Sequence, residues 1–180
     1  MWKLKDPKPV KLIIGILAAD RQCLHAGIEA LTHKLGTADF TSDVWLFDKT
    51  DYYKDQTGPH ILRQFVSIEK LIDPGKLAKI KCQTNKLEQK LAKTLALPLP
   101  RPANLDPGII EPAKLVLATT KNYSHRIYIG KKMYAEVTLA FDKGNWRPLG
   151  HTFPDYRQKC YYDFFFKVRI RLLEQLKSQR

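Results

Sequence analysis

The feature that most constrains this chain is an apolar run close to its N-terminus. Leu12–Ala19 holds no polar side chain, and Asp20 follows it before residues with helical spacing. The lysines ahead of the run resemble those of a signal peptide, but the run is short for one and Lys11 lies against it. A buried strand that leads into a helix capped by Asp20 explains the same residues. We therefore expect a central strand over 10–18, and no other run approaches transmembrane length.

Periodicity and turn residues divide the rest of the chain into further elements. Strands are expected over 44–47, 61–70, 104–110, 125–129 and 133–141. A turn at Asp106-Pro107-Gly108 is expected to interrupt the third of these. Helices are expected over 21–35, from Pro74 up to residue 97, over 113–119 and from Pro154 onward. The residues between 48 and 60 are expected to form a loop.

This order predicts an α+β fold in a single domain that spans residues 1–180. We expect a mixed β-sheet with about three main helices packed on it, and the first half allows a ferredoxin-like β-α-β-β-α arrangement. The Pro-rich stretch 97–103 cannot continue a helix and is expected to form an extended connector. The connector links parts of one domain, because too little chain stands on either side for two independent cores.

The chain is strongly basic, with a formal net charge of +13 over 180 residues. Residues 1–60 are neutral, whereas residues 61–120 carry +5 and residues 121–180 carry +8. Such a field attracts polyanions, whether nucleic acid, nucleotide or acidic lipid. A solvated helix face is an equally good interpretation, because one predicted helix is apolar on one side and lysine-rich on the other. The lysines of that face are Lys76, Lys79, Lys86, Lys90 and Lys93.

The motifs argue against several classes of protein. Three cysteines stand far apart without a C-x-x-C pair, which predicts reduced thiols in a cytoplasmic protein and neither a disulfide framework nor a zinc knuckle. The histidines show no metal-ligand spacing, so no metal site is predicted, and no cofactor is indicated. The phosphate-binding motif of Walker-type GTPases is absent. The nucleophile elbow, the zinc-protease motif and the dinucleotide-binding loop are absent as well.

Several segments of the chain are characteristic when they are taken together: 104–108, 114–121, 125–128, 134–139 and 154–157, with Asp51-Tyr52-Tyr53, Ile80-Lys81, Thr84-Asn85 and the opening strand. In this combination they resemble a family of bacterial and archaeal proteins called domain of unknown function 4416. The resemblance implies a small stand-alone protein of unknown activity. Members are sometimes labelled GTP-binding, and no established catalytic residues come with the family. His151 departs from the pattern, which leads us to expect a tryptophan there.

Unlike charges gather beside the turns of the C-terminal half. The candidate catalytic residues are Asp106, His125 and Glu136, and the candidate ligand-binding residues are Lys81, Asn85, Lys121, Arg126 and Arg157. Asp106 would contact a phosphate or a metal, or else only shape its turn, and His125 would be a general acid or base, or else structural. Arg157 opposes the dipole of the last helix, so we expect it to face an acid or a bound anion. Lys81 and Asn85 share one helix edge.

A predicted hairpin brings two of these charges together. If residues 130–132 form its loop, the register places Arg126 opposite Glu136 and Tyr128 opposite Tyr134. The ion pair would line a polar face, which is either solvated surface or the floor of a site; both interpretations stay open. The opposite face is apolar and is expected to pack inward: Ile127, Ile129, Ala135, Val137, Leu139 and Phe141.

The leading hypothesis is a binding protein or small enzyme for a phosphorylated or nucleotide-like small molecule, with this polar cluster as its pocket. The alternative is a basic RNA-binding module, whose binding would weaken steeply with salt. A structural partner in a complex is the third interpretation. No membrane association is predicted, and the oligomeric state stays open.

Overall fold

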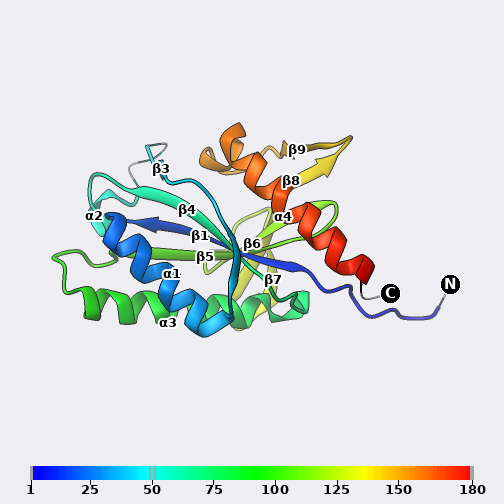
Figure 1. The fold of residues 1–180 in the computed structure, drawn as a ribbon, viewed down its shortest axis with the longest axis horizontal. Coiled ribbons are helices and arrows are strands. Elements are labelled where there is room, and N and C mark those ends of the chain that lie inside the picture. Colours follow the sequence, from blue (N-terminus) through cyan, green and yellow to red (C-terminus); the bar gives the residue numbers. More distant parts are fainter. Residues whose placement is uncertain (1, 49, 51, 179–180) are drawn as a thin grey trace.

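One sheet runs through the molecule and carries its helices (Figure 1). The structure is a computed structural model, and it describes residues 2–48, 50 and 52–178. Its strands are β1 (Lys11–Ala18), β2 (Ala38–Thr41), β3 (Trp45–Leu46), β4 (Leu62–Ile68), β5 (Ala103–Ile110), β6 (Lys114–Thr119), β7 (Ile127–Gly130), β8 (Met133–Asp142) and β9 (Asn145–Pro148). Its helices are α1 (Arg21–Leu35), α2 (Lys54–Thr57), α3 (Leu77–Leu95) and α4 (Lys159–Ser178), with short 3-10 helices η1 (Pro74–Lys76) and η2 (Asp155–Arg157).

The strand order explains the direction of every strand in the sheet. The order is β2-β4-β1-β5-β6-β8-β7, with β3 added to β4 and β9 added to β8. The chain passes through α1 from β1 to β2, and β4 fills the place between them; α3 connects β4 to β5 across β1 in the same way. These two split β-α-β units form the ferredoxin-like arrangement, and they keep parallel strands apart. The described pairings are therefore antiparallel where we expected a mixed sheet, and the predicted α+β class is confirmed.

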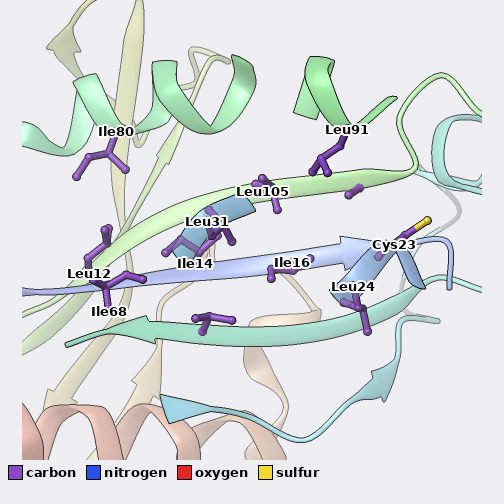
Figure 2. Packing of buried hydrophobic residues seen from close by; sticks show 13 residues of the cluster. Leu12, Ile14, Ile16, Cys23, Leu24, Leu31, Ile68, Ile80, Leu91 and Leu105 are labelled. Atoms are coloured by element: carbon purple, nitrogen blue, oxygen red, sulfur yellow. The ribbon is translucent and has the colours of Figure 1, made fainter. Parts of the chain in front are cut away.

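The two faces of the sheet are covered by different helices (Figure 1). Leu12, Ile14 and Ile16 of β1 pack under α1 and α3, as Figure 2 shows. On the other face, Ile13 and Phe65 pack against an aromatic cluster supplied largely by α4. β1 is buried along its whole length because both faces and both edges are covered. No helix in the described ranges is long and apolar enough to cross a membrane.

The ends of the first strand and helix agree with the sequence analysis. The side chain of Asp20 accepts a hydrogen bond of 2.7 Å from the amide of Cys23, and α1 ends at Gly36, whose φ of 111° suits glycine. Lys11 belongs to the strand and not to a leader: its side chain is fully buried, pairs with Asp39 and donates to the carbonyl of Ile68 at 2.9 Å.

Several local predictions were wrong, each for a tertiary reason. The helix expected over 113–119 is the strand β6, because pairing with β5 and β8 on its two sides outweighs local preference. The loop expected over 48–60 contains α2, and β2 and β9 were not expected. The last helix begins at Lys159, after η2, and not at Pro154.

The most informative error concerns Asp106-Pro107-Gly108, which forms no turn. β5 runs without a break through these residues and pairs with β1 along its length. Its pairing with β6 covers only Gly108 to Ile110. Pro107 has no N–H to donate, so the ladder between β5 and β6 stops at this residue and the two strands diverge. The sheet is split at one side of β5.

Gly108 allows β5 and β6 to pair closely next to the split. A Cβ atom at this position would lie 2.6 Å from Cδ2 of Leu117 and 2.7 Å from the carbonyl oxygen of Val116, so β6 approaches closely only because residue 108 is glycine. Two adjacent residues therefore set the limit of the β5–β6 pairing: Gly108 allows β6 to approach, and Pro107, the residue before it, ends the ladder.

We predict that Gly108→Ala lowers the free energy of unfolding by about 2 kcal/mol, because the added methyl group must push β6 away from β5. Urea denaturation measures this change. Gly150→Ala is the matched control, since no atom lies within 4 Å of its Cβ position, and we expect a change of less than about 0.5 kcal/mol. Equal effects of the two substitutions would contradict the role given to Gly108.

Candidate functional site

A cavity of about 990 Å³ opens where β5 and β6 diverge. It is lined by residues of β5 and α3, by residues at the end of β6, by Asp155 and Tyr156 of η2, and by Phe47, Thr50, Tyr52, Tyr53 and Gln56. Its charged lining residues are Arg63, Lys81, Glu88, Arg101, Asp106, Lys121, Arg126, Glu136 and Asp155. The cavity therefore exists because the sheet is split, and it is lined by charged groups from seven elements or loops.

Two side chains of α3 take the place of the missing strand partner of β5. Glu88 Oε1 accepts a hydrogen bond of 2.7 Å from the backbone N–H of Leu105, and Lys81 Nζ donates to the carbonyl of the same residue at 3.2 Å. A buried backbone group without a partner costs about 1–3 kcal/mol, so these two contacts are needed wherever β6 does not reach.

The same two side chains continue into a network of ion pairs. Lys81 Nζ also donates to Asp106 Oδ1 at 2.8 Å, and Asn104 Nδ2 donates to the other carboxylate oxygen at 2.5 Å. Arg101 donates to Glu88 Oε2 through Nε at 3.0 Å and through Nη2 at 2.5 Å. Each carboxylate is thus held by a cation and by one further donor.

The two carboxylates differ in pKa although both belong to one network. Burial raises the pKa of Glu88, and the Lys81 and Arg101 charges do not fully offset that rise. Burial acts in the same direction on Asp106, but Lys81, Arg63 and Arg101 together hold its pKa below the ordinary value. Asp106 is therefore the firmly ionised member of the network.

Arg63 is the most unusual side chain in the cavity. It lies on β4 with only 4% of its side chain exposed, and its Nη2 donates to Asp155 Oδ2 at 2.6 Å. Its Nε and Nη1 atoms are buried and have no hydrogen-bond partner among the described residues. The hydroxyls of Tyr156 and Tyr161 stand nearby, and neither meets the geometry of a full hydrogen bond, although the contact with Arg63 counteracts part of the rise that burial causes in the pKa of Tyr161. Buried polar atoms in this state are rare in native proteins and indicate a missing partner.

The surroundings of Arg63 keep the guanidinium in place. Its Cζ atom lies 5.2 Å from the ring centres of both Phe47 and Phe65. Beneath it, a Cβ atom on Gly15 would stand 2.8 Å from Nη1, so the central strand has room for the guanidinium only because residue 15 is glycine. Arg63 is thus held rigidly with part of its donors unused.

Glu136 forms the second unusual point of the cavity. Its Oε2 accepts from Arg126 Nε at 2.8 Å and from His125 Nε2 at 3.0 Å, and only 1% of the side chain is exposed. Its Oε1 is buried without a hydrogen-bond partner in the described part of the chain. Of the two interpretations of the Arg126–Glu136 pair, the structure therefore supports the floor of a cavity and not a solvated surface.

The hairpin that carries this pair has the predicted pairing of Tyr128 with Tyr134, but its loop is shorter than expected. Gly130 belongs to β7 and pairs with Met133, so the loop is 131–132 where 130–132 was expected, and a bulge between Tyr128 and Gly130 accommodates the difference. The apolar face is not wholly inward as expected, because Ile127 is 74% exposed. β7 is the last strand in the order of the sheet, so within the described residues only one of its edges is paired with another strand.

Six of the eight candidate site residues line the same cavity: Lys81, Asn85, Asp106, Lys121, Arg126 and Glu136. His125 is not among the lining residues. It forms a hydrogen bond with Glu136 and stacks on His151, with 4.1 Å between the ring centres. Arg157 is also outside the lining, and no acidic side chain among the described residues pairs with it. Its guanidinium donates to the carbonyls of Leu149, Gly150 and Thr152, which shapes the loop before η2.

The polar cavity residues that the sequence analysis did not single out include Arg63, Glu88, Arg101, Asn104 and Asp155. Arg63 lies in the strand that was expected over 61–70. β4 is an interior strand, however, so its second face is buried too. Phe65, two residues from Arg63 and therefore on the same face, was the signal that could have shown this.

Among the described residues, no group of three or more His, Cys, Asp or Glu side chains could hold a metal ion.

We predict opposite pH dependences for two variants of the network. The lowered pKa of Asp106 stabilises the fold above pH 3.8, its ordinary pKa, and this contribution is lost as the pH falls through the folded-state value. Asp106→Asn removes it, so the difference in unfolding free energy between wild type and variant should shrink in acid. The raised pKa of Glu88 acts in the other direction.

For Glu88→Gln, wild type should lose stability relative to the variant as the pH rises from 4.5, the ordinary pKa of the group, through its folded-state value. Urea denaturation at a series of pH values measures both differences. Slopes of the same sign for the two variants would contradict the assigned directions.

Comparison with known proteins gives one match. The model of the family described as a domain of unknown function, DUF4416, matches residues 8–171. No curated protein and no solved structure matches the chain. The segments that resemble this family in the sequence analysis lie inside the matched range, and of their residues Asp51 lies outside the described part of the structure. Because the match covers most of the chain, this protein belongs to the DUF4416 family.

Proposed function

We propose that the cavity binds a phosphorylated or nucleotide-like small molecule, whose anionic group is held by Arg63. The observation that carries the proposal is the buried guanidinium itself: Nη2 is occupied by Asp155, whereas Nε and Nη1 have no hydrogen-bond partner in the part of the chain that the structure describes. Leaving such donors unpaired costs about 1–3 kcal/mol, and a phosphate oxygen is the acceptor that a guanidinium binds best.

The charge of the cavity supports an anion of low charge. Five Lys and Arg side chains line it against four Asp and Glu side chains. The carboxylates of Glu88, Asp106, Glu136 and Asp155 are each paired with a cation. A phosphate group would therefore meet a cavity of slightly positive charge in which its acidic neighbours are already neutralised.

The remaining lining suits the organic part of a ligand. The volume of about 990 Å³ lies at the upper end of the range of about 300–1,000 Å³ for small-molecule sites. Phe47, Tyr53 and Phe153 contribute aromatic surface. Burial raises the pKa of Tyr53 to about 12, so its hydroxyl stays protonated at neutral pH.

If the site also performs a reaction, Glu136 is the proton acceptor that its geometry favours, because both oxygens of Asp106 are already hydrogen-bonded.

We predict that Arg63→Lys weakens binding of a phosphorylated probe by about 10-fold or more, because lysine lacks the planar pair of donors. Titration calorimetry with inorganic phosphate, ribose 5-phosphate and adenosine 5′-monophosphate (AMP) measures the affinity. Arg147→Lys is the matched control: this exposed arginine lies on β9, and we expect unchanged binding. Tyr156→Phe is a second test. It removes only the buried hydroxyl beside Arg63, so it should weaken binding by a smaller factor.

Unchanged affinity in Arg63→Lys, or no binding of any phosphorylated probe to the wild type, would sink the proposal. Binding of RNA that weakens steeply with salt, without binding of these small probes, would instead support the basic surface as the functional feature.

A further inference from the structure

We infer that the ligand is extended and carries a hydroxyl or amino group at the end opposite its phosphate, where Glu136 accepts a hydrogen bond from it. This inference rests on the proposed function, since it takes the anionic end to be at Arg63. The observation behind it is a different one. Glu136 is among the residues that line the cavity, and its Oε1 atom is buried with no hydrogen-bond partner among the described residues.

The contacts of Glu136 determine what its free oxygen can recognise. Oε2 is occupied by two donors, Arg126 Nε and His125 Nε2, and Arg126 forms an ion pair with the carboxylate. A carboxylate in an ion pair only accepts hydrogen bonds. Oε1 therefore needs an N–H or O–H group from the ligand, whereas the unpartnered atoms of Arg63 need the opposite, an acceptor. The cavity thus contains two unpaired points of opposite hydrogen-bonding character.

The sheet register separates the strands that carry the two groups. Glu136 lies opposite Leu117, which lies opposite Gly108 of β5, while Arg63 lies opposite Leu17 of β1. The Arg63 guanidinium reaches over Gly15, which brings it to the position of β1. From β1 to β8 there are three strand spacings, about 14 Å of sheet. A ligand that satisfies both groups must bridge most of this width, which suits a nucleoside monophosphate better than inorganic phosphate.

Two sources can supply the donor of such a ligand: the ribose hydroxyls or an exocyclic amino group of the base. In either case a ligand without that donor leaves the buried carboxylate oxygen unpaired, and sites of this kind discriminate strongly against the analogue. The shared requirement is a hydrogen-bond donor at the end of the ligand away from the phosphate.

The test compares matched nucleotides on the wild type. AMP and inosine 5′-monophosphate differ in whether the base presents an amino group or a carbonyl at one position, as do cytidine and uridine 5′-monophosphates. AMP and its 2′,3′-dideoxy analogue differ only in the ribose hydroxyls. We expect one of these changes to weaken binding by about 10-fold or more, and the pair that shows it identifies the source of the donor.

Glu136→Gln gives a second, sharper readout. Arg126 and His125 both donate to the side chain, so the amide oxygen of the variant will face them and its NH₂ group will face the ligand. The free point then changes from acceptor to donor, and the preference found in the wild type should disappear, or reverse if the donor is the base amino group. Glu174→Gln, an exposed residue on α4, is the matched control and should keep the wild-type preference.

The outcomes separate this inference from the proposed function. If all the nucleotides bind the wild type equally well and binding still depends on Arg63, the inference about Glu136 is overturned and anion binding at Arg63 stands. If no phosphorylated probe binds, the proposed function fails and this inference fails with it. The nucleotide comparison uses only wild-type protein, so poor folding of a variant does not affect it.

Discussion

The cavity depends on the fact that β5 is paired with β6 over only part of its length. An interior strand normally satisfies its backbone from both sides, but Pro107 supplies no donor and the ladder ends there. Beyond this point the N–H and carbonyl of Leu105 are satisfied by Glu88 and Lys81. The opening in the sheet is thus a stable feature, because two charged side chains replace a neighbouring strand.

This arrangement gives α3 two roles. Its apolar side packs Ile80 and Leu91 on the sheet, and one edge of the helix carries Lys81 and Glu88 into the split. These two charges could not be buried under β5 alone, because an isolated buried charge is costly. They are tolerated because each also forms an ion pair. Lys81 pairs with Asp106 of β5, and Glu88 pairs with Arg101, which precedes β5. Structural and functional roles therefore share the same side chains.

Prediction from sequence succeeded where local rules decide the outcome. Asp20 and Gly36 mark the ends of α1 through their own capping chemistry. The alternation of residues along two consecutive strands brings Tyr128 opposite Tyr134 and Arg126 to Glu136, although the loop between the strands is one residue shorter than expected. It failed where pairing across the sheet decides. Asp106-Pro107-Gly108 has the composition of a turn, and nothing local shows that β1 holds these residues straight.

The same limit explains the two largest errors about the site. Arg63 was overlooked because its burial follows from the neighbours of β4, which are distant in sequence. Arg157 was assigned to a ligand because a cation at a helix start is unfavourable, yet three nearby carbonyls supply its partners. Local electrostatics showed that Arg157 needs acceptors but could not show which acceptors the loop provides.

The distribution of charge separates attraction of a ligand from its recognition. The net charge of +13 is spread over the surface, and the lysines of the outer face of α3, such as Lys79 and Lys86, are exposed. Such a field raises the rate at which any anion arrives, but it does not distinguish one anion from another. The cavity is nearly balanced in charge, and its selectivity must come from the few atoms that the fold leaves unpaired. These atoms, on Arg63 and Glu136, are held rigidly by neighbours that are themselves satisfied, which is the condition for selective binding.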